Sequence, residues 1–176
     1  MNTAEAKIRD FERLMLPHLN AAHNLARWLM KSDTDAQDAV QESYLRAFRF
    51  FDGFHGEDGR AWLLAIVRNT CRSSLQHRQT TAADEFDEAQ HSPSLAMSTP
   101  EQAAMRAAGI SSVQTCIEAL PAEYREVVIM RELEDCSYKE IAAAIGAPIG
   151  TVMSRLARAR ARLQKCLAAR ARKAGV

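Results

Sequence analysis

The apolar residues in the first half of the chain recur with the period of an α-helix and predict three helices. The first covers 11–29, with a kink or break at Pro17, because proline lacks the N–H that a helix interior needs. The second covers 35–48 and is capped by one of three polar residues at 32–34. The third covers 60–78, so this half of the chain predicts a small helical bundle.

The segment 137–163 predicts two helices that meet at a tight corner. Ser137 and Glu140 have the spacing of a capping box, in which each side chain bonds a backbone N–H at the helix start. Gly146 supplies the turn, and Pro148 fits the first turn of the second helix. This arrangement is typical of a helix-turn-helix, whose second helix binds DNA.

Two shorter helices are predicted before this motif, at 113–120 and 121–133. The run 127–130 consists of residues that also suit a strand, but the helical period on either side favours a helix. We therefore predict an all-α fold of two small helical domains joined by a flexible linker, with the helix-turn-helix in the C-terminal domain.

The predicted linker differs in composition from the segments on either side. Residues 79–105 contain five acids, no Lys or Arg, two prolines and no continuous apolar stripe. We expect an N-terminal domain at 1–79, an acidic linker at 80–108 and a C-terminal domain at 109–176.

Positive charge is concentrated in two of the predicted helices. From residue 150 onward the chain has eight Lys or Arg and no acid, and 60–78 also contains no acid. Each could be a solvated basic face, but the first coincides with a capped helix-turn-helix, so DNA phosphate is the expected counter-charge. The loop at 52–59 carries Phe54 and His55, which suit either base stacking or packing against the neighbouring helices.

Three acids on the helix at 35–48 lie along one edge, at positions Asp35, Asp38 and Glu42. Such an edge can simply keep the helix soluble, or it can be a docking face for a basic partner. The residues alone favour the first interpretation.

Composition and cysteine spacing exclude several classes of function. No apolar run is long enough to span a membrane and no signal sequence is present, so we expect a cytoplasmic protein without membrane insertion.

The cysteines have no metal-binding spacing; Cys71, Cys116 and Cys166 are expected to be buried small hydrophobes. Cys136 precedes a helix start, where a thiolate and a redox role are conceivable. We expect no catalytic residues, no metal and no cofactor.

Taken together, the motifs resemble the extracytoplasmic-function sigma factors, the two-domain initiation subunits of bacterial RNA polymerase. The resemblance covers nearly the whole chain. It rests on these segments: 35–48 (DAQDAVQESYLRAF), 62–69 (WLLAIVRN), 119–128 (ALPAEYREVV), 137–142 (SYKEIA) and 150–160 (GTVMSRLARAR). The corner at 134–136 departs from the family pattern, because Asp-Cys stands where Gly and an apolar residue are usual.

The resemblance implies partners and site residues. Asp35, Asp38 and Glu42 would dock on the clamp helices of core RNA polymerase. The −10 element of promoter DNA would contact Arg68, Asn69, Arg72, Phe54 and His55. The last two, an aromatic pair, would hold a base flipped out of the duplex. The −35 element would contact the second helix of the helix-turn-helix through Thr151, Ser154, Arg155, Arg158 and Arg162. An anti-sigma factor would control the protein.

Two other functions are compatible with parts of the sequence. A one-component regulator would bind operator DNA through the helix-turn-helix without polymerase. An enzyme with an all-helical site has little support, because the chain has no paired carboxylates, nucleophile arrangement or glycine-rich phosphate loop.

Overall fold

The computed structural model describes residues 3–56, 58–81 and 112–173, and these residues form helices and their connections, with no strand among them. The all-α prediction is confirmed. The elements in chain order are α1 (Thr3–Met15), the 3₁₀ turn η1 (Leu16–His18), α2 (Leu19–Met30), α3 (Asp33–Phe50), the 3₁₀ turn η2 (Phe51–Gly53), α4 (Gly59–Thr81), a helical segment at 112–118, α6 (Ala122–Val128), the π-helical turn η3 (Ile129–Leu133), α7 (Tyr138–Ile145) and α8 (Ile149–Lys173).

The N-terminal helices follow the sequence signals closely. Pro17 lies in η1, which separates α1 from α2 as a predicted break should. Ser32 is the residue that caps α3, because its side chain accepts a hydrogen bond from the backbone N–H of Asp35 at 3.4 Å. Helix α4 begins one residue before the predicted start and continues to Thr81, so the first two residues of the predicted linker are helical. The rest of the linker lies outside the described residues.

The helix-turn-helix is formed by α7 and α8. The capping box is present: Ser137 Oγ accepts from the backbone N–H of Glu140 at 3.2 Å, and Glu140 Oε2 accepts from that of Ser137 at 2.5 Å. Gly146 ends α7 with φ +64°, in the left-handed region. Helix α8 then runs without interruption for 25 residues.

Replacing Gly146 with alanine should lower the free energy of unfolding by about 1 kcal/mol, because a Cβ is disfavoured in the left-handed region. No neighbouring atom would contact that Cβ, so backbone conformation alone causes the loss. The matched control is Gly150→Ala, which also meets open space but lies in the first turn of α8. Urea unfolding should place the control at or above wild type; equal midpoints for the two variants would contradict the expectation.

The run at 127–130 is helical, as predicted, although η3 is a wider π-helical turn. It ends at the unusual corner 134–136. Asp135 there has φ +49°, while Glu134 and Cys136 are buried. Burial raises the pKa of the Cys136 thiol to about 11, which disfavours the thiolate that the sequence left conceivable.

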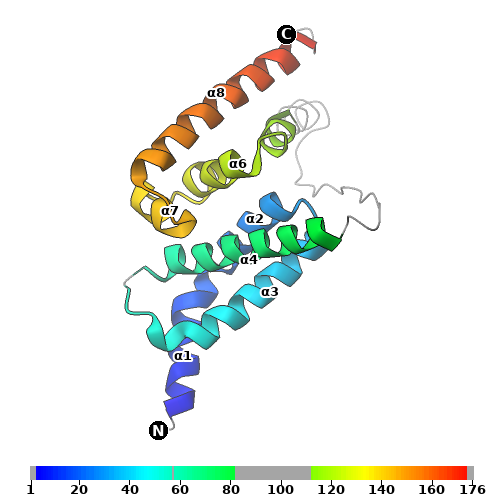
Figure 1. The fold of residues 1–176 in the computed structure, drawn as a ribbon. Helices are drawn as coiled ribbons and strands as arrows, with labels where there is room; N and C mark the ends of the chain where they lie inside the picture. The colour runs from blue at the N-terminus through cyan, green and yellow to red at the C-terminus, as the bar shows by residue number, and fades with distance from the viewer. Residues whose placement is uncertain (1–2, 57, 82–111, 174–176) are drawn as a thin grey trace, which may run out of the picture.

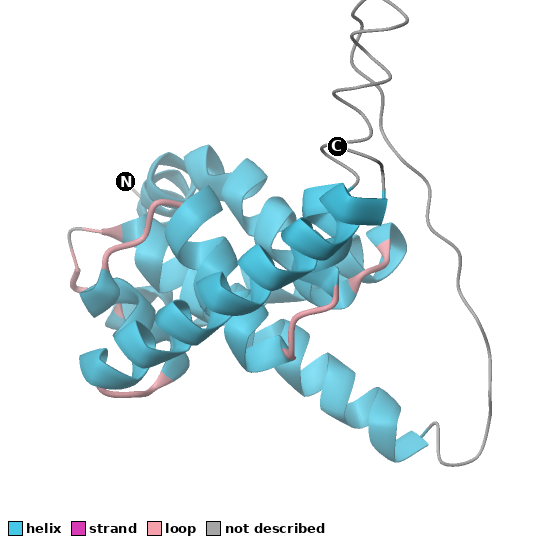
Figure 2. Cartoon of the chain, turned by 90° about the horizontal axis from the view of Figure 1, so that it is seen from above, coloured by secondary structure: helices cyan, strands magenta, loops and turns pink. Residues whose placement is uncertain are grey.

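The two helical halves pack directly against each other. Helix α4 lies against α7, and α2 contacts α6, so that α6 and α7 cover one side of the layer formed by α2, α3 and α4, while α8 packs against α6 and α7 (Figure 1). The view from above shows the described part of the chain as helices joined by short loops (Figure 2). A single apolar core runs through both halves; its largest fully buried members include Met15, Leu25, Leu63, Leu64, Ile129, Met130, Ile141 and Leu156. This closed arrangement determines which surfaces are exposed.

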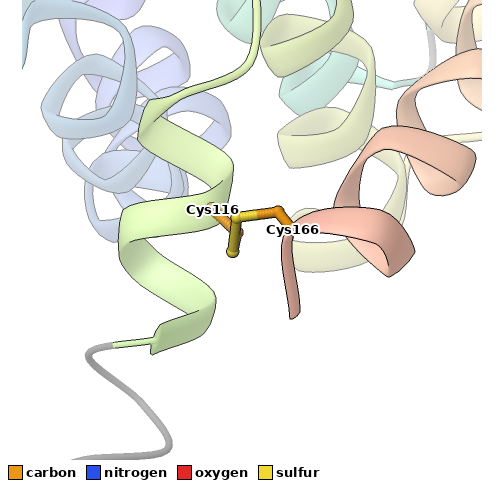
Figure 3. Close-up of a disulfide and its surroundings, with 2 residues drawn as sticks. All are labelled: Cys116 and Cys166. Carbon is orange, nitrogen blue, oxygen red and sulfur yellow. A yellow bond between two sulfur atoms is a disulfide. The ribbon is translucent and has the colours of Figure 1, made fainter. Parts of the chain in front are cut away.

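The cysteine predictions hold only in part. Cys116, in the 112–118 helix, and Cys166, in α8, form a disulfide with Cα atoms 5.8 Å apart (Figure 3). The predicted burial of Cys116 is confirmed, since only 1% of it is exposed, whereas Cys166 is half-buried. The disulfide was not predicted, because it depends on helix packing that aligns residues 50 apart in sequence. Cys71 is a free buried thiol, as predicted.

Among the described residues, no helix combines the length and hydropathy needed to cross a bilayer. Over the same ranges, no cluster of His, Cys, Asp or Glu side chains has the geometry of a metal site.

Candidate nucleic-acid interface

The N-terminal half of α8 presents a polar surface over a buried stripe. Val152, Leu156 and Ala159 face the core, which leaves the predicted DNA side chains on the remaining faces. Ser154 and Arg158 are exposed, and Thr151 is half-buried. Ser154 Oγ donates to the carbonyl of Thr151 at 3.0 Å. These three residues therefore remain accessible on the second helix of the helix-turn-helix.

The other two predicted −35 residues interact with α6. Arg155 lies 3.5 Å from Glu126 and 3.9 Å from Glu123, measured between guanidinium nitrogen and carboxylate oxygen. Arg162 lies over the ring of Tyr124, with its guanidinium carbon 5.1 Å from the ring centroid. These contacts orient both arginines within the C-terminal domain, which sequence reasoning did not anticipate.

Helix α4 carries three of the five predicted −10 residues, and one of these three is not where the sequence placed it. Arg68 was expected on the outer face, but only 5% of it is exposed. It forms a two-pronged ion pair with Glu126 of α6, with N···O distances of 2.8 and 2.9 Å. The expectation failed because Glu126 of α6 lies against Arg68, and that contact joins residues 58 apart in sequence.

Asn69 and Arg72 are exposed on α4, as predicted. Asn69 Oδ1 accepts a hydrogen bond from Arg68 Nη1 at 3.0 Å, which orients its side-chain amide. Arg72 lines a cleft of about 380 Å³ between α4 and α6.

The loop before α4 separates its two aromatic candidates. Phe54 is half-buried, with its ring centroid 4.9 Å from that of Trp62 and 6.1 Å from that of Phe51. His55 is exposed. Phe54 therefore packs against the bundle, which was the alternative left open by the sequence, and His55 is the accessible member of the pair.

The acidic edge of α3 is only partly available to a partner. Asp35 forms an ion pair with Arg78 of α4, and this hydrogen bond holds the pKa of Asp35 below its ordinary value. Asp38 is exposed, and Glu42 pairs with Arg46 one turn away at 2.7 Å on the surface. Asp38 and Glu42 thus keep the exposure that a docking residue needs.

A groove of about 920 Å³ lies between α2 and α3, beside this edge. Its apolar lining includes side chains that are substantially exposed, namely Leu16, Leu19, Leu45 and Phe48. Phe48 is the least exposed of these four, with 36% of it exposed. Gln37 and Gln41 add polar groups along α3. Sequence reasoning missed the groove, although Leu45 falls outside the core stripe of its helix and is the residue that could have indicated it.

The comparisons with known proteins agree with this two-part arrangement. Residues 14–81 match the family described as Sigma-70 region 2, and residues 110–163 match Sigma-70, region 4. The chain belongs to the extracytoplasmic-function sigma factors of bacterial RNA polymerase. Its function is that of an alternative sigma factor in transcription initiation, and the comparisons do not support the one-component regulator.

Individual relatives extend over most of the chain. The RNA polymerase sigma-H factor of Pseudomonas aeruginosa is 33% identical over 168 residues, covering 90% of this chain and 86% of the relative. The ECF RNA polymerase sigma-E factor of Escherichia coli is 37% identical over 134 residues, covering 72% and 70%. The sigma factor RpoE of Bartonella quintana, solved with the anti-sigma factor NepR, has a TM-score of 0.75 and 31% identity over 90% of this chain and 97% of that one.

Proposed function

We propose that this chain directs core RNA polymerase to promoters through two DNA surfaces, one in each domain. The domain at 1–79 binds core polymerase and the −10 element, and the domain at 109–176 binds the −35 element. The observation that carries the proposal is the capped helix-turn-helix with Ser154 and Arg158 exposed on α8. The chain itself catalyses no reaction, and it acts in the cytoplasm, where core polymerase is found.

Run-off transcription with purified core polymerase on genomic fragments tests this function. The sigma-factor proposal predicts discrete transcripts that require both the chain and core enzyme. Transcripts independent of the chain would overturn it, and so would tight operator binding without polymerase.

At the −35 element, Thr151, Ser154 and Arg158 are the residues we assign to base edges and phosphates. Arginine pairs with guanine through two hydrogen bonds, and hydroxyl groups bond either bases or phosphate. Arg155 and Arg162 are already oriented by α6, so they suit contacts with the flanking backbone.

Replacing Arg158 with alanine should reduce promoter-dependent transcription by roughly 5- to 150-fold, which corresponds to about 1–3 kcal/mol for one good base contact. Arg158 is exposed, so the fold should persist. The matched control is Arg172→Ala, which removes the same charge in the last turn of the same helix. Run-off yield at limiting holoenzyme is the measurement; equal losses in both variants would show that only overall charge matters.

At the −10 element, we assign Asn69, Arg72 and His55 to the non-template strand. Exposed amide, guanidinium and imidazole groups bind unpaired bases by hydrogen bonding and stacking, at about 1–3 kcal/mol per stacked base. Stacking and hydrogen bonding at these residues would offset the few kcal/mol that unstacking a base costs. Arg68 joins this surface only when its contact with Glu126 is broken.

For polymerase docking, we propose the groove between α2 and α3 together with Asp38 and Glu42. Apolar side chains in the groove supply contact area, and the adjacent acids select a basic partner surface. Asp35 contributes less than its neighbours because Arg78 already neutralises it.

We also propose that an anti-sigma factor binds this chain. The B. quintana sigma factor was solved with NepR, and CnrH, whose TM-score to this chain is 0.66 at 26% identity, was solved with the cytosolic domain of CnrY.

A further inference from the structure

We propose that two buried glutamates, Glu126 and Glu134, form an interdomain latch that holds the free chain closed and keeps Arg68 from DNA. The latch is defined by these two carboxylates of the C-terminal half and their partners Asn24, Arg60 and Arg68 in the N-terminal half. The proposal rests on the proposed function, in that α4 is taken as a DNA surface.

Glu126 forms the first half of the latch. Both of its oxygens accept hydrogen bonds from Arg68, at 2.8 and 2.9 Å, and only 6% of each side chain is exposed. The geometry is the two-pronged arginine–carboxylate pairing, which is the strongest form of such contacts. Arg155 of α8 approaches the same carboxylate at 3.5 Å. One glutamate therefore occupies an arginine from each of the two proposed DNA-binding helices.

Glu134 forms the second half, at the corner where the sequence departs from its family. Its side chain is 6% exposed and accepts hydrogen bonds from Asn24 of α2 and from Arg60 Nη2 of α4, the latter at 3.1 Å. Both donors belong to the N-terminal half of the chain, so the two halves are joined at two separate points. Asn24 also lines the groove between α2 and α3, so a partner seated in that groove is adjacent to the latch.

The closed state and DNA contact by Arg68 exclude each other. Arg68 donates from Nε and Nη2 to Glu126 and from Nη1 to Asn69, so every nitrogen of its guanidinium is already paired in the closed state. Opening exchanges the Glu126 carboxylate for a DNA phosphate of the same charge, so Arg68 stays paired in both states. The cleft between α4 and α6, which contains both Arg68 and Glu126 in its lining, gives solvent and ions access to the pair.

The test uses the full chain with Glu126→Gln, Glu134→Gln and the double variant. Glutamine keeps the side-chain shape but removes the negative charge, which weakens each contact. The matched control is Glu132→Gln, because Glu132 lies two residues from Glu134 and pairs on the surface with Arg160 of its own domain. Small-angle X-ray scattering reports opening, and fluorescence anisotropy with promoter DNA, without polymerase, reports DNA affinity.

We expect the double variant to have a larger radius of gyration and at least about tenfold tighter promoter binding than wild type, with each single variant between them and Glu132→Gln unchanged. Glu126→Gln also releases Arg155, so it can raise affinity without opening. Glu134 contacts none of the residues assigned to the −35 element. A gain of DNA affinity in Glu134→Gln therefore reports opening of the chain and not release of Arg155. Circular dichroism checks that the helices persist; should Glu126→Gln unfold, the Glu134→Gln result alone decides.

Two results would overturn the latch: an unchanged radius of gyration in Glu134→Gln and the double variant, or opening without any gain in DNA affinity. Run-off transcription by wild type distinguishes this failure from failure of the proposed function. Normal polymerase-dependent transcripts with an unchanged radius in the variants reject the latch alone. Absence of transcripts from wild type rejects the function.

Discussion

Replacing Asp38 and Glu42 together with arginine should abolish assembly with core RNA polymerase, raising the dissociation constant by more than about 100-fold. Both side chains are exposed on α3, each next in sequence to a glutamine that lines the apolar groove, and the double change converts two negative charges into two positive ones. A basic partner surface would then face two positive charges where the wild-type protein presents two negative ones. Loss of the surface pair between Glu42 and Arg46 should cost less than about 1 kcal/mol of stability.

Competition binding with fluorescently labelled core enzyme measures this effect. The control is Glu5→Arg with Glu12→Arg, which changes the charge by the same amount on the exposed face of α1, outside the groove. The control should bind core enzyme within about twofold of wild type. If the α3 variant co-purifies with polymerase as well as the control does, the docking assignment is wrong.

Reducing the Cys116–Cys166 disulfide should lower the free energy of unfolding of the C-terminal half by about 2–4 kcal/mol, the typical range for a native disulfide. The cross-link joins residues 50 apart, and closing a loop of that size removes about 4 kcal/mol of chain entropy from the unfolded state in the simplest treatment. Thermal unfolding in the presence and absence of dithiothreitol should therefore give clearly different midpoints.

The control for this measurement is the double variant Cys116→Ser with Cys166→Ser, whose midpoint should not respond to dithiothreitol. Cys71 and Cys136 are buried free thiols in both proteins, so any effect of the reagent on them appears in the control too. Identical midpoints for oxidised and reduced wild type would show that the disulfide does not stabilise the fold.

Features encoded by neighbouring residues could be predicted from the sequence. The break at Pro17, the cap at Ser32 and the box formed by Ser137 and Glu140 each depend on side chains within a few positions of the backbone groups they affect. The buried stripe of α8 likewise follows from helical spacing alone. The family resemblance drawn from these local motifs is confirmed by the comparisons.

Features that depend on packing between distant segments could not be predicted. Arg68 has the sequence context of a solvent-facing arginine, and only the position of α6 determines that Glu126 covers it. Cysteine spacing cannot give disulfide connectivity, so Cys116 and Cys166 had the pattern of ordinary core residues. The groove between α2 and α3 is also a product of helix packing. The DNA and polymerase roles of individual side chains stay predictions until the variants above are measured.

The unbroken length of α8 has a mechanical consequence. At 1.5 Å per residue its 25 residues extend about 37 Å, roughly three times the ~12 Å width of the major groove. Only its first turns can enter the groove, and the remainder must emerge beside the duplex. Since Cys166 joins this emerging part covalently to the 112–118 helix, α8 cannot tilt alone in the oxidised protein: any change of its angle to the DNA axis carries the 112–118 helix with it.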